Sequence, residues 1–187
     1  IYNDARAENM ASGGKKLGIE IHQMMYSFSN NQNALDTSFF VNYKIFNRSQ
    51  ESYHDVKAAV FTDLDIGNPY DDYIGCDTLR NTYYAYNAND IDSSLHNAYQ
   101  SEVGYYSNPP SMGIVYLNNE ISNFAYFNNV GSGNPNTTDP SNWLDYYHYM
   151  NSKWKDNVPF SWGGNGYDYP IAQHTNYLFP GDVTDTS

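Results

Sequence analysis

The chain has 187 residues, enough for one sizeable hydrophobic core, and its 21 acidic against 9 basic residues give a formal net charge of -12. That charge repels nucleic acid and anionic membrane surfaces, so neither is an expected partner. The 20 tyrosines, together with abundant Asn, Ser, Gly and Asp, are typical of strands and loops rather than helices. No apolar run approaches the roughly 20 residues that cross a bilayer, so no membrane insertion is expected.

The chain starts at Ile1 without a methionine, so we expect it to be a mature or excised piece of a longer polypeptide. Residues 1–16 show no clean hydrophobic period and are expected to form a lead-in segment before a single domain over residues 17–187. Cys76 is the only cysteine, which excludes an internal disulfide and predicts a buried thiol.

Alternating apolar and polar residues predict most of the secondary structure. The alternation begins at Leu17 and runs to Phe28, as in a half-buried strand. Two further strands follow around a polar turn, which gives three sequential antiparallel candidates. The other predicted strands, in chain order after the first, are residues 38–47, 54–62, 82–86, 112–117, 123–128 and 175–179.

One segment carries helix signals instead. Asp139 is a capping residue, Pro140 follows it, and apolar side chains recur through Trp143 and Met150, so residues 139–150 predict a helix of about three turns. Short strands separated by turns, without a repeat of 20–50 residues, favour a mainly β fold. The expected architecture is an antiparallel β-sandwich, jelly-roll or Ig-like, with one short helix and long loops.

Acidic residues are concentrated between Lys57 and Arg80, where no basic residue intervenes. Carboxylates at that density repel one another, and Ca²⁺, which accepts six to eight oxygen ligands, would neutralise them. The alternative is an exposed acidic loop in which Asp71 or Asp72 caps turns. The predicted calcium ligands are Asp63, Asp65 and Asp72, followed by Asp71 and Asp77.

This calcium site is not an EF-hand, because the twelfth position of that loop would be Ile74 where Glu is required. Zinc is not expected either. The stretch offers oxygen ligands apart from Cys76, and the five histidines are scattered along the chain.

The sequence contains no G-x-S-x-G, H-E-x-x-H, P-loop or dinucleotide fingerprint, so we do not expect an enzyme. Carbohydrate binding is the alternative function, because flat tryptophan rings can cover sugar faces while Asn and Asp bind hydroxyls. The candidate rings are Trp143, Trp154 and Trp162, unless these aromatics fill the core.

Several motifs in order carry a family resemblance. Residues 63–77 (DLDIGNPYDDYIGCD) are followed by a Tyr-rich run at 83–87, by a Pro-Pro and strand at 109–114, and by the run FAYFNN at 124–129. With the ending over residues 154–182, the pattern resembles a module of large secreted surface proteins of Bacteroidetes, often exported by the type IX secretion system. The resemblance implies a secreted, surface-associated β domain.

Together these observations predict a non-catalytic extracellular structural or adhesive module of a secreted or cell-surface bacterial protein, stabilised by calcium. Its expected partners are neighbouring domains of a longer polypeptide, other cell-surface proteins, and glycans. A carbohydrate-binding module is the second expectation, and a hydrolase-associated domain is the third.

Overall fold

The computed structural model describes residues 1–4, 11–29, 34–96, 101–167 and 173–182. The fold is mainly β, with antiparallel sheets and one short helix, as the sequence predicts. The chain divides into two compact units, the first made of Ile1–Val56 and Ser141–Trp143, the second of Lys57–Pro140 and Leu144–Ser187. No sheet in the described residues has more than three strands, so the sandwich stays a prediction, as does a single domain over residues 17–187.

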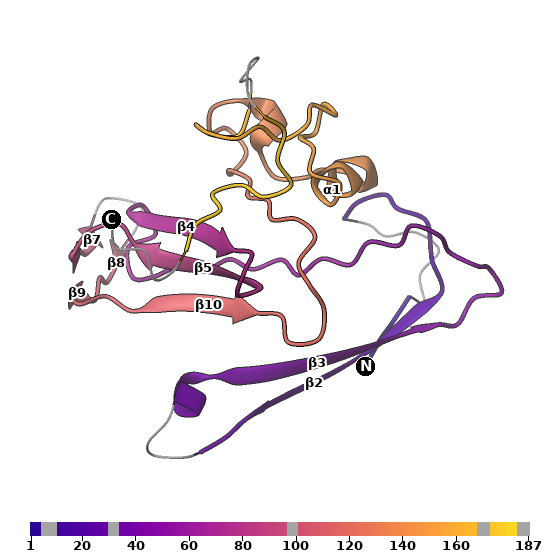
Figure 1. Cartoon of the computed structure of the whole chain (residues 1–187), viewed down its shortest axis with the longest axis horizontal. Helices are drawn as coiled ribbons and strands as arrows, with labels where there is room; N and C mark the ends of the chain where they lie inside the picture. The colour runs from indigo at the N-terminus through magenta and orange to yellow at the C-terminus, as the bar shows by residue number, and fades with distance from the viewer. Residues whose placement is uncertain (5–10, 30–33, 97–100, 168–172, 183–187) are drawn as a thin grey trace. The chain divides into compact units, whose positions relative to one another are not determined.

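The first unit is built on a long antiparallel ribbon (Figure 1). Nine consecutive residue pairs join its two main strands, from Ile19 opposite Asn47 to Ser27 opposite Phe39. These strands confirm the predictions at residues 17–28 and 38–47, since their alternating side chains suit a pleated ribbon. The elements are β1 (Tyr2–Asn3), β2 (Ile19–Ser27), the 3₁₀ turn η1 (Ala34–Thr37) and β3 (Phe39–Asn47), and the sheet order is β1-β2-β3.

The β2–β3 ribbon exposes large apolar side chains on both faces. Phe39 is 74 % exposed, and Met24 and Ile45 are more than half exposed. Contact across the ribbon is largely aromatic: the Tyr26 and Phe40 rings stack with their centroids 5.4 Å apart. Such cross-strand pairs stabilise the ribbon itself without covering its faces.

The predicted strand at residues 54–62 is wrong, because this segment runs as irregular chain. Its alternating side chains have no sheet face to enter, and Val56 is 71 % exposed. A strand appears instead inside the acidic stretch, at β4 (Asp72–Asp77). Its three last residues are buried, so this acidic segment belongs to the second unit's sheet and not to a loop.

The second unit contains a three-stranded antiparallel sheet with β5 in the centre (Figure 1). The turn from β4 to β5 is closed by Asp77, whose Oδ1 accepts hydrogen bonds from the backbone N–H groups of Leu79 and Arg80. Asn81 completes that turn with a φ of 57°, a conformation that Asn tolerates better than most residues. The strands are β4, β5 (Thr82–Asn87) and β10 (Ser111–Val115), which confirms the predictions at 82–86 and 112–117.

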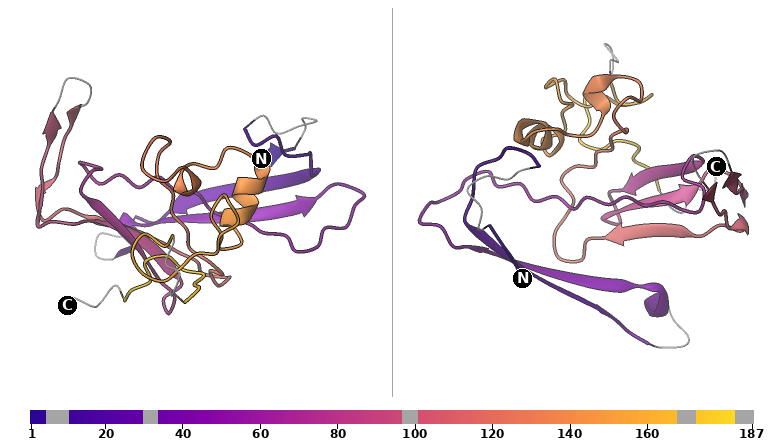
Figure 2. Two further views of the ribbon diagram at one scale, coloured as in Figure 1. Left: turned by 90° about the horizontal axis from the view of Figure 1, so that it is seen from above. Right: turned by 180° about the vertical axis from the view of Figure 1, so that it is seen from behind.

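Between β5 and β10 the chain forms two nested antiparallel ribbons, which extend from one end of the sheet (Figure 2). The outer pair brings Asp92 opposite Tyr106. The four short strands are β6 (Ile91–Asp92), β7 (Leu95–His96), β8 (Ser101–Glu102) and β9 (Tyr106–Ser107), with β6 paired to β9 and β7 to β8.

The hydrophobic core of the second unit is aromatic and centres on Trp154. Tyr149, Phe160 and Leu178 are buried with it. Residues 123–128 and 175–179, predicted as strands, contribute only isolated bridges, such as Phe124 opposite Tyr177. The remaining elements are the 3₁₀ turn η2 (Pro135–Thr137) and α1 (Trp143–Tyr149).

The helix α1 is shorter than the predicted 139–150. Asp139 lies before it and closes a different turn, since its Oδ2 accepts a hydrogen bond from the Val130 N–H. Ser152, at a φ of 59°, then turns the chain away from the helical direction. Within the described residues, no helix has the length and apolar character needed to cross a membrane.

Cys76 is fully buried in β4, and its Sγ lies 3.5 Å from the backbone oxygen of Leu178. Burial, helped by the nearby charge of Asp77, raises the pKa of the thiol to about 12. Because the thiolate is the reactive species, we expect the folded chain not to react with a thiol reagent such as DTNB at pH 8. One thiol per chain should react in denaturant, and rapid stoichiometric reaction of the folded chain would contradict the buried placement.

Candidate metal centre

Three buried side-chain oxygens at one end of the β4–β5 pair lack a hydrogen-bond partner within the described part of the chain. They are Asp71 Oδ1, Asp72 Oδ1 and Asn87 Oδ1. Asp72 opens β4 and is directly opposite Asn87, the last residue of β5, so both side chains leave the same face of the sheet. A buried acceptor without a donor is costly, and three at adjoining positions of this strand pair indicate an unmet need for a hydrogen-bond donor or a cation.

Asn87 contributes a neutral oxygen to this group. Its side chain is 8 % exposed, and its Nδ2 donates to the backbone oxygen of Asn89 at 2.8 Å. With the amide nitrogen committed there, the amide oxygen is the atom left to accept. Amide oxygens of Asn are ordinary ligands of Ca²⁺.

Asp72 lies among other negative charges. Burial raises the pKa of this carboxyl, the hydrogen bond from the Ile66 N–H to Oδ2 at 2.7 Å opposes that rise, and the charges of Asp71, Asp92 and Asp65 add to it. The raised pKa means that ionising Asp72 is less favourable in the folded chain than in the unfolded chain. A cation bound beside Asp72 would instead lower the pKa of its carboxyl and favour the ionised form.

Asp92 is the carboxylate that the sequence prediction missed. It is fully buried, its Oδ1 accepts from the Asn68 N–H at 3.1 Å, and its Oδ2 accepts from the Tyr105 N–H at 2.6 Å. A Cβ added at Gly67, where φ is 64°, would come within 1.9 Å of Asp92 Oδ2. The glycine therefore lets the acidic loop close directly over this carboxylate.

The five predicted ligands are divided by the structure. Asp65, Asp71 and Asp72 belong to the charge cluster at the start of β4, and both Asp65 and Asp63, two residues before it, are exposed. Asp77 ends β4, opposite Thr82, at the other end of the strand. Its buried carboxylate is bound by the Arg80 guanidinium, so it already has a cation partner.

The donor set at the start of β4 suits a hard cation, because it consists of carboxylate and amide oxygens. Among the described residues, no three Asp, Glu, His or Cys side chains already surround a single metal position. Ca²⁺ binding at this centre would therefore need Asp65, Asp71, Asp72 and Asp92 to draw together, with Asn87 and backbone or water oxygens completing the shell.

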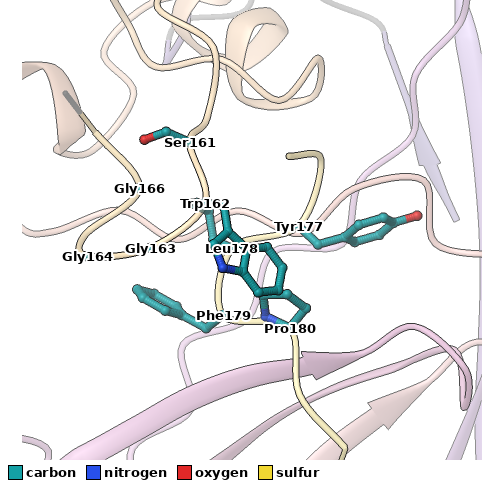
Figure 3. A pocket seen from close by; sticks show the side chains of 9 residues that line it. All are labelled: Ser161, Trp162, Gly163, Gly164, Gly166, Tyr177, Leu178, Phe179 and Pro180. Atoms are coloured by element: carbon teal, nitrogen blue, oxygen red, sulfur yellow. The ribbon is translucent and has the colours of Figure 1, made fainter. Parts of the chain in front are cut away.

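The three tryptophans of the predicted carbohydrate site have different environments. Trp154 is fully buried between aromatic neighbours, so its ring presents no face to a ligand. Trp143 and Trp162 are 56 % and 57 % exposed. Trp162 lines a pocket in the second unit (Figure 3). Trp143 belongs to the first unit.

Comparison with protein-family models, with curated proteins and with solved structures found no match to this chain.

Proposed function

We propose that this chain is a non-catalytic structural or adhesive module of a secreted or cell-surface protein, and that Ca²⁺ orders its acidic loop. The observation that carries the proposal is the group of buried oxygens on Asp71, Asp72 and Asn87 that have no hydrogen-bond partner among the described residues. They lie where the charges of Asp65 and Asp92 also act.

A cation at this position would join segments that are distant in sequence. Asp65 and Asp71 lie in the loop before β4, Asn87 ends β5, and Asp92 lies in β6. One ion would therefore fasten the loop to the sheet and to the ribbon that follows it. Calcium sites of extracellular modules typically have dissociation constants of about 10⁻⁴–10⁻³ M, so such a site would be filled outside the cell.

The adhesive part of the proposal rests on the β2–β3 ribbon. Soluble proteins rarely expose contiguous large apolar surfaces, and such surfaces commonly mark protein–protein contacts. The ribbon exposes Met24, Met25, Phe39, Tyr43 and Ile45. Its partners in this proposal are neighbouring domains of a longer polypeptide or other cell-surface proteins.

The calcium proposal predicts a melting temperature that rises with Ca²⁺. At a Ca²⁺ concentration 100 times the dissociation constant, binding to the folded state alone adds about 2.7 kcal/mol. For a chain of about this length that is roughly 5–11 °C. Calorimetry of the whole chain in EDTA and at increasing Ca²⁺ measures the shift, and isothermal titration gives the stoichiometry.

Two matched substitutions separate calcium binding from general stability. Asp72→Asn keeps an oxygen for the Ile66 N–H but removes a charge, so it should melt no lower than the unmodified chain in EDTA and lose most of the calcium shift. Asp77→Asn weakens the pair with Arg80, so it should melt lower in both buffers and keep the shift. An unmodified chain that does not respond to Ca²⁺, or an Asp72→Asn chain that responds fully, would contradict the proposal.

A further inference from the structure

The pocket beside Trp162 is a second place, within the described residues, with a buried polar atom that lacks a hydrogen-bond partner. Ser161 is 5 % exposed, and its Oγ has no hydrogen-bond partner within the described residues. The backbone N–H of Ser161 already donates to the Gly166 oxygen at 3.0 Å, and that of Trp162 to the Gln173 oxygen at 2.9 Å. Ser161 is one of the residues that line the pocket, and its buried Oγ comes to face the pocket only when the side chain rotates.

The pocket combines flat rings with a glycine turn. The rings of Trp162, Phe179 and Pro180 gather beside Gly163 and Gly164 (Figure 3). Both glycines have positive φ, 90° and 55°, so the backbone itself, without side chains, forms this wall. Trp162 is the more exposed of the two aromatic rings, at 57 % against 38 % for Phe179.

The shape of the turn is fixed by packing on the core. A Cβ added at Gly166 would come within 2.4 Å of the Leu178 side chain. The backbone oxygen of Gly166 accepts a hydrogen bond from Trp154 Nε1 at 2.7 Å. The pocket is thus built on the buried aromatic core, which holds the turn in place before any ligand arrives.

The chemistry of the lining restricts the ligand. None of the nine described residues that line the pocket is charged, and the chain's net charge of -12 disfavours anions such as nucleotides. The volume of about 260 Å³ lies slightly below the roughly 300–1,000 Å³ typical of drug-sized ligands. A small neutral ring with one apolar face and hydroxyl groups at its edge meets these conditions.

We propose that the Trp162 pocket binds a single neutral sugar ring of a glycan. The apolar face of a pyranose would cover the Trp162 indole, and ring hydroxyls would reach the backbone of the glycine turn and, once the Ser161 side chain rotates toward the pocket, its Oγ. This inference concerns a different site from the calcium proposal and does not depend on it. It narrows carbohydrate recognition to one of the two exposed tryptophans.

A glycan array probed with the whole chain, followed by titration calorimetry with soluble glucose, galactose, mannose, N-acetylglucosamine and fucose, tests the inference. We expect binding to at least one of these neutral sugars or to a glycan that ends in it. Trp162→Ala should weaken that binding by about tenfold or more, and Ser161→Ala by a smaller factor. Trp143→Ala, which removes an equally exposed ring outside the pocket, should leave it unchanged.

Circular dichroism and melting of each variant show that it is folded before binding is compared. Absence of binding on the array and to all five sugars would overturn the inference, as would binding that survives Trp162→Ala. A chain that responds to Ca²⁺ but binds no sugar would overturn this inference and leave the calcium proposal intact. A chain that binds sugar without responding to Ca²⁺ would overturn the calcium proposal and leave this inference intact.

Discussion

Replacing Trp154 with alanine should lower the free energy of unfolding of the second unit by about 3–5 kcal/mol, the range for a large buried aromatic. The Trp154 ring meets those of Tyr126, Tyr149 and Phe160 with centroids 4.9–5.9 Å apart. Its removal leaves a cavity at the centre of the aromatic core and leaves the Gly166 oxygen with one donor, the Ser161 N–H, in place of two. Urea unfolding followed by circular dichroism measures the loss.

Two further substitutions separate the contribution of the Trp154 hydrogen bond from that of burying an aromatic ring. Trp154→Phe keeps an aromatic ring but loses the Nε1 donor, so a smaller loss of about 1–3 kcal/mol is expected. Trp162→Ala removes a ring of the same kind that is more than half exposed, and should change stability by no more than about 0.5 kcal/mol. Equal losses for Trp154→Ala and Trp162→Ala would contradict the placement of Trp154.

Replacing Asp92 with asparagine should be the most damaging isosteric change in the acidic region. Each carboxylate oxygen of Asp92 accepts a hydrogen bond from a different backbone N–H, on Asn68 and on Tyr105. An amide can accept only one of them, and its NH₂ group would face the other donor inside the protein. An unpaired buried donor costs about 1–3 kcal/mol, so we expect a loss at the upper end of that range, measured in EDTA.

The matched control is Asp90→Asn, two residues earlier at an exposed position. It removes the same charge without touching a buried hydrogen bond, so its effect should stay within about 0.5 kcal/mol. If Asp90→Asn and Asp92→Asn were equally stable, the buried role of Asp92 would be refuted.

Local alternation was enough to predict the strands whose neighbours in space are neighbours in sequence. β2 and β3 follow one another and pair along their whole length, so the period-two pattern was enough to predict both strands. The same pattern at residues 54–62 failed because alternation does not show whether a sheet face is present to receive the side chains. Val56 and its neighbours stay exposed instead.

The acidic residues of the segment that forms β4 led to the prediction of a loop where the structure has a strand. The carboxylates at the ends of β4 suggested one acidic loop, but Ile74, Gly75 and Cys76 between them lie in the sheet. The strand carries Asp72 and Asp77 to opposite ends, where they meet different partners. The density of carboxylates in the sequence therefore indicated that an acidic cluster exists, but it did not show which carboxylates belong to it.

The sequence prediction missed Asn87 and Asp92, because both reach the acidic cluster through strands that are separated from it in sequence. Asn87 becomes a neighbour of Asp72 only through the β4–β5 register, and Asp92 reaches the acidic loop only because β6 follows β5 closely. Neither carries a local signal stronger than that of any other polar residue in an Asn-rich chain. The β4–β5 pairing, had it been predicted, would have placed Asn87 beside Asp72.

The uninterrupted register of β2 and β3 limits which insertions and deletions the chain can tolerate. Side chains alternate between faces, so deleting one residue within either strand would exchange the faces of every residue beyond it. Removal of two residues preserves the alternation and only shortens the ribbon. Related chains should therefore vary in length at the connection between Ser27 and Phe39, and differ within the strands by even numbers of residues.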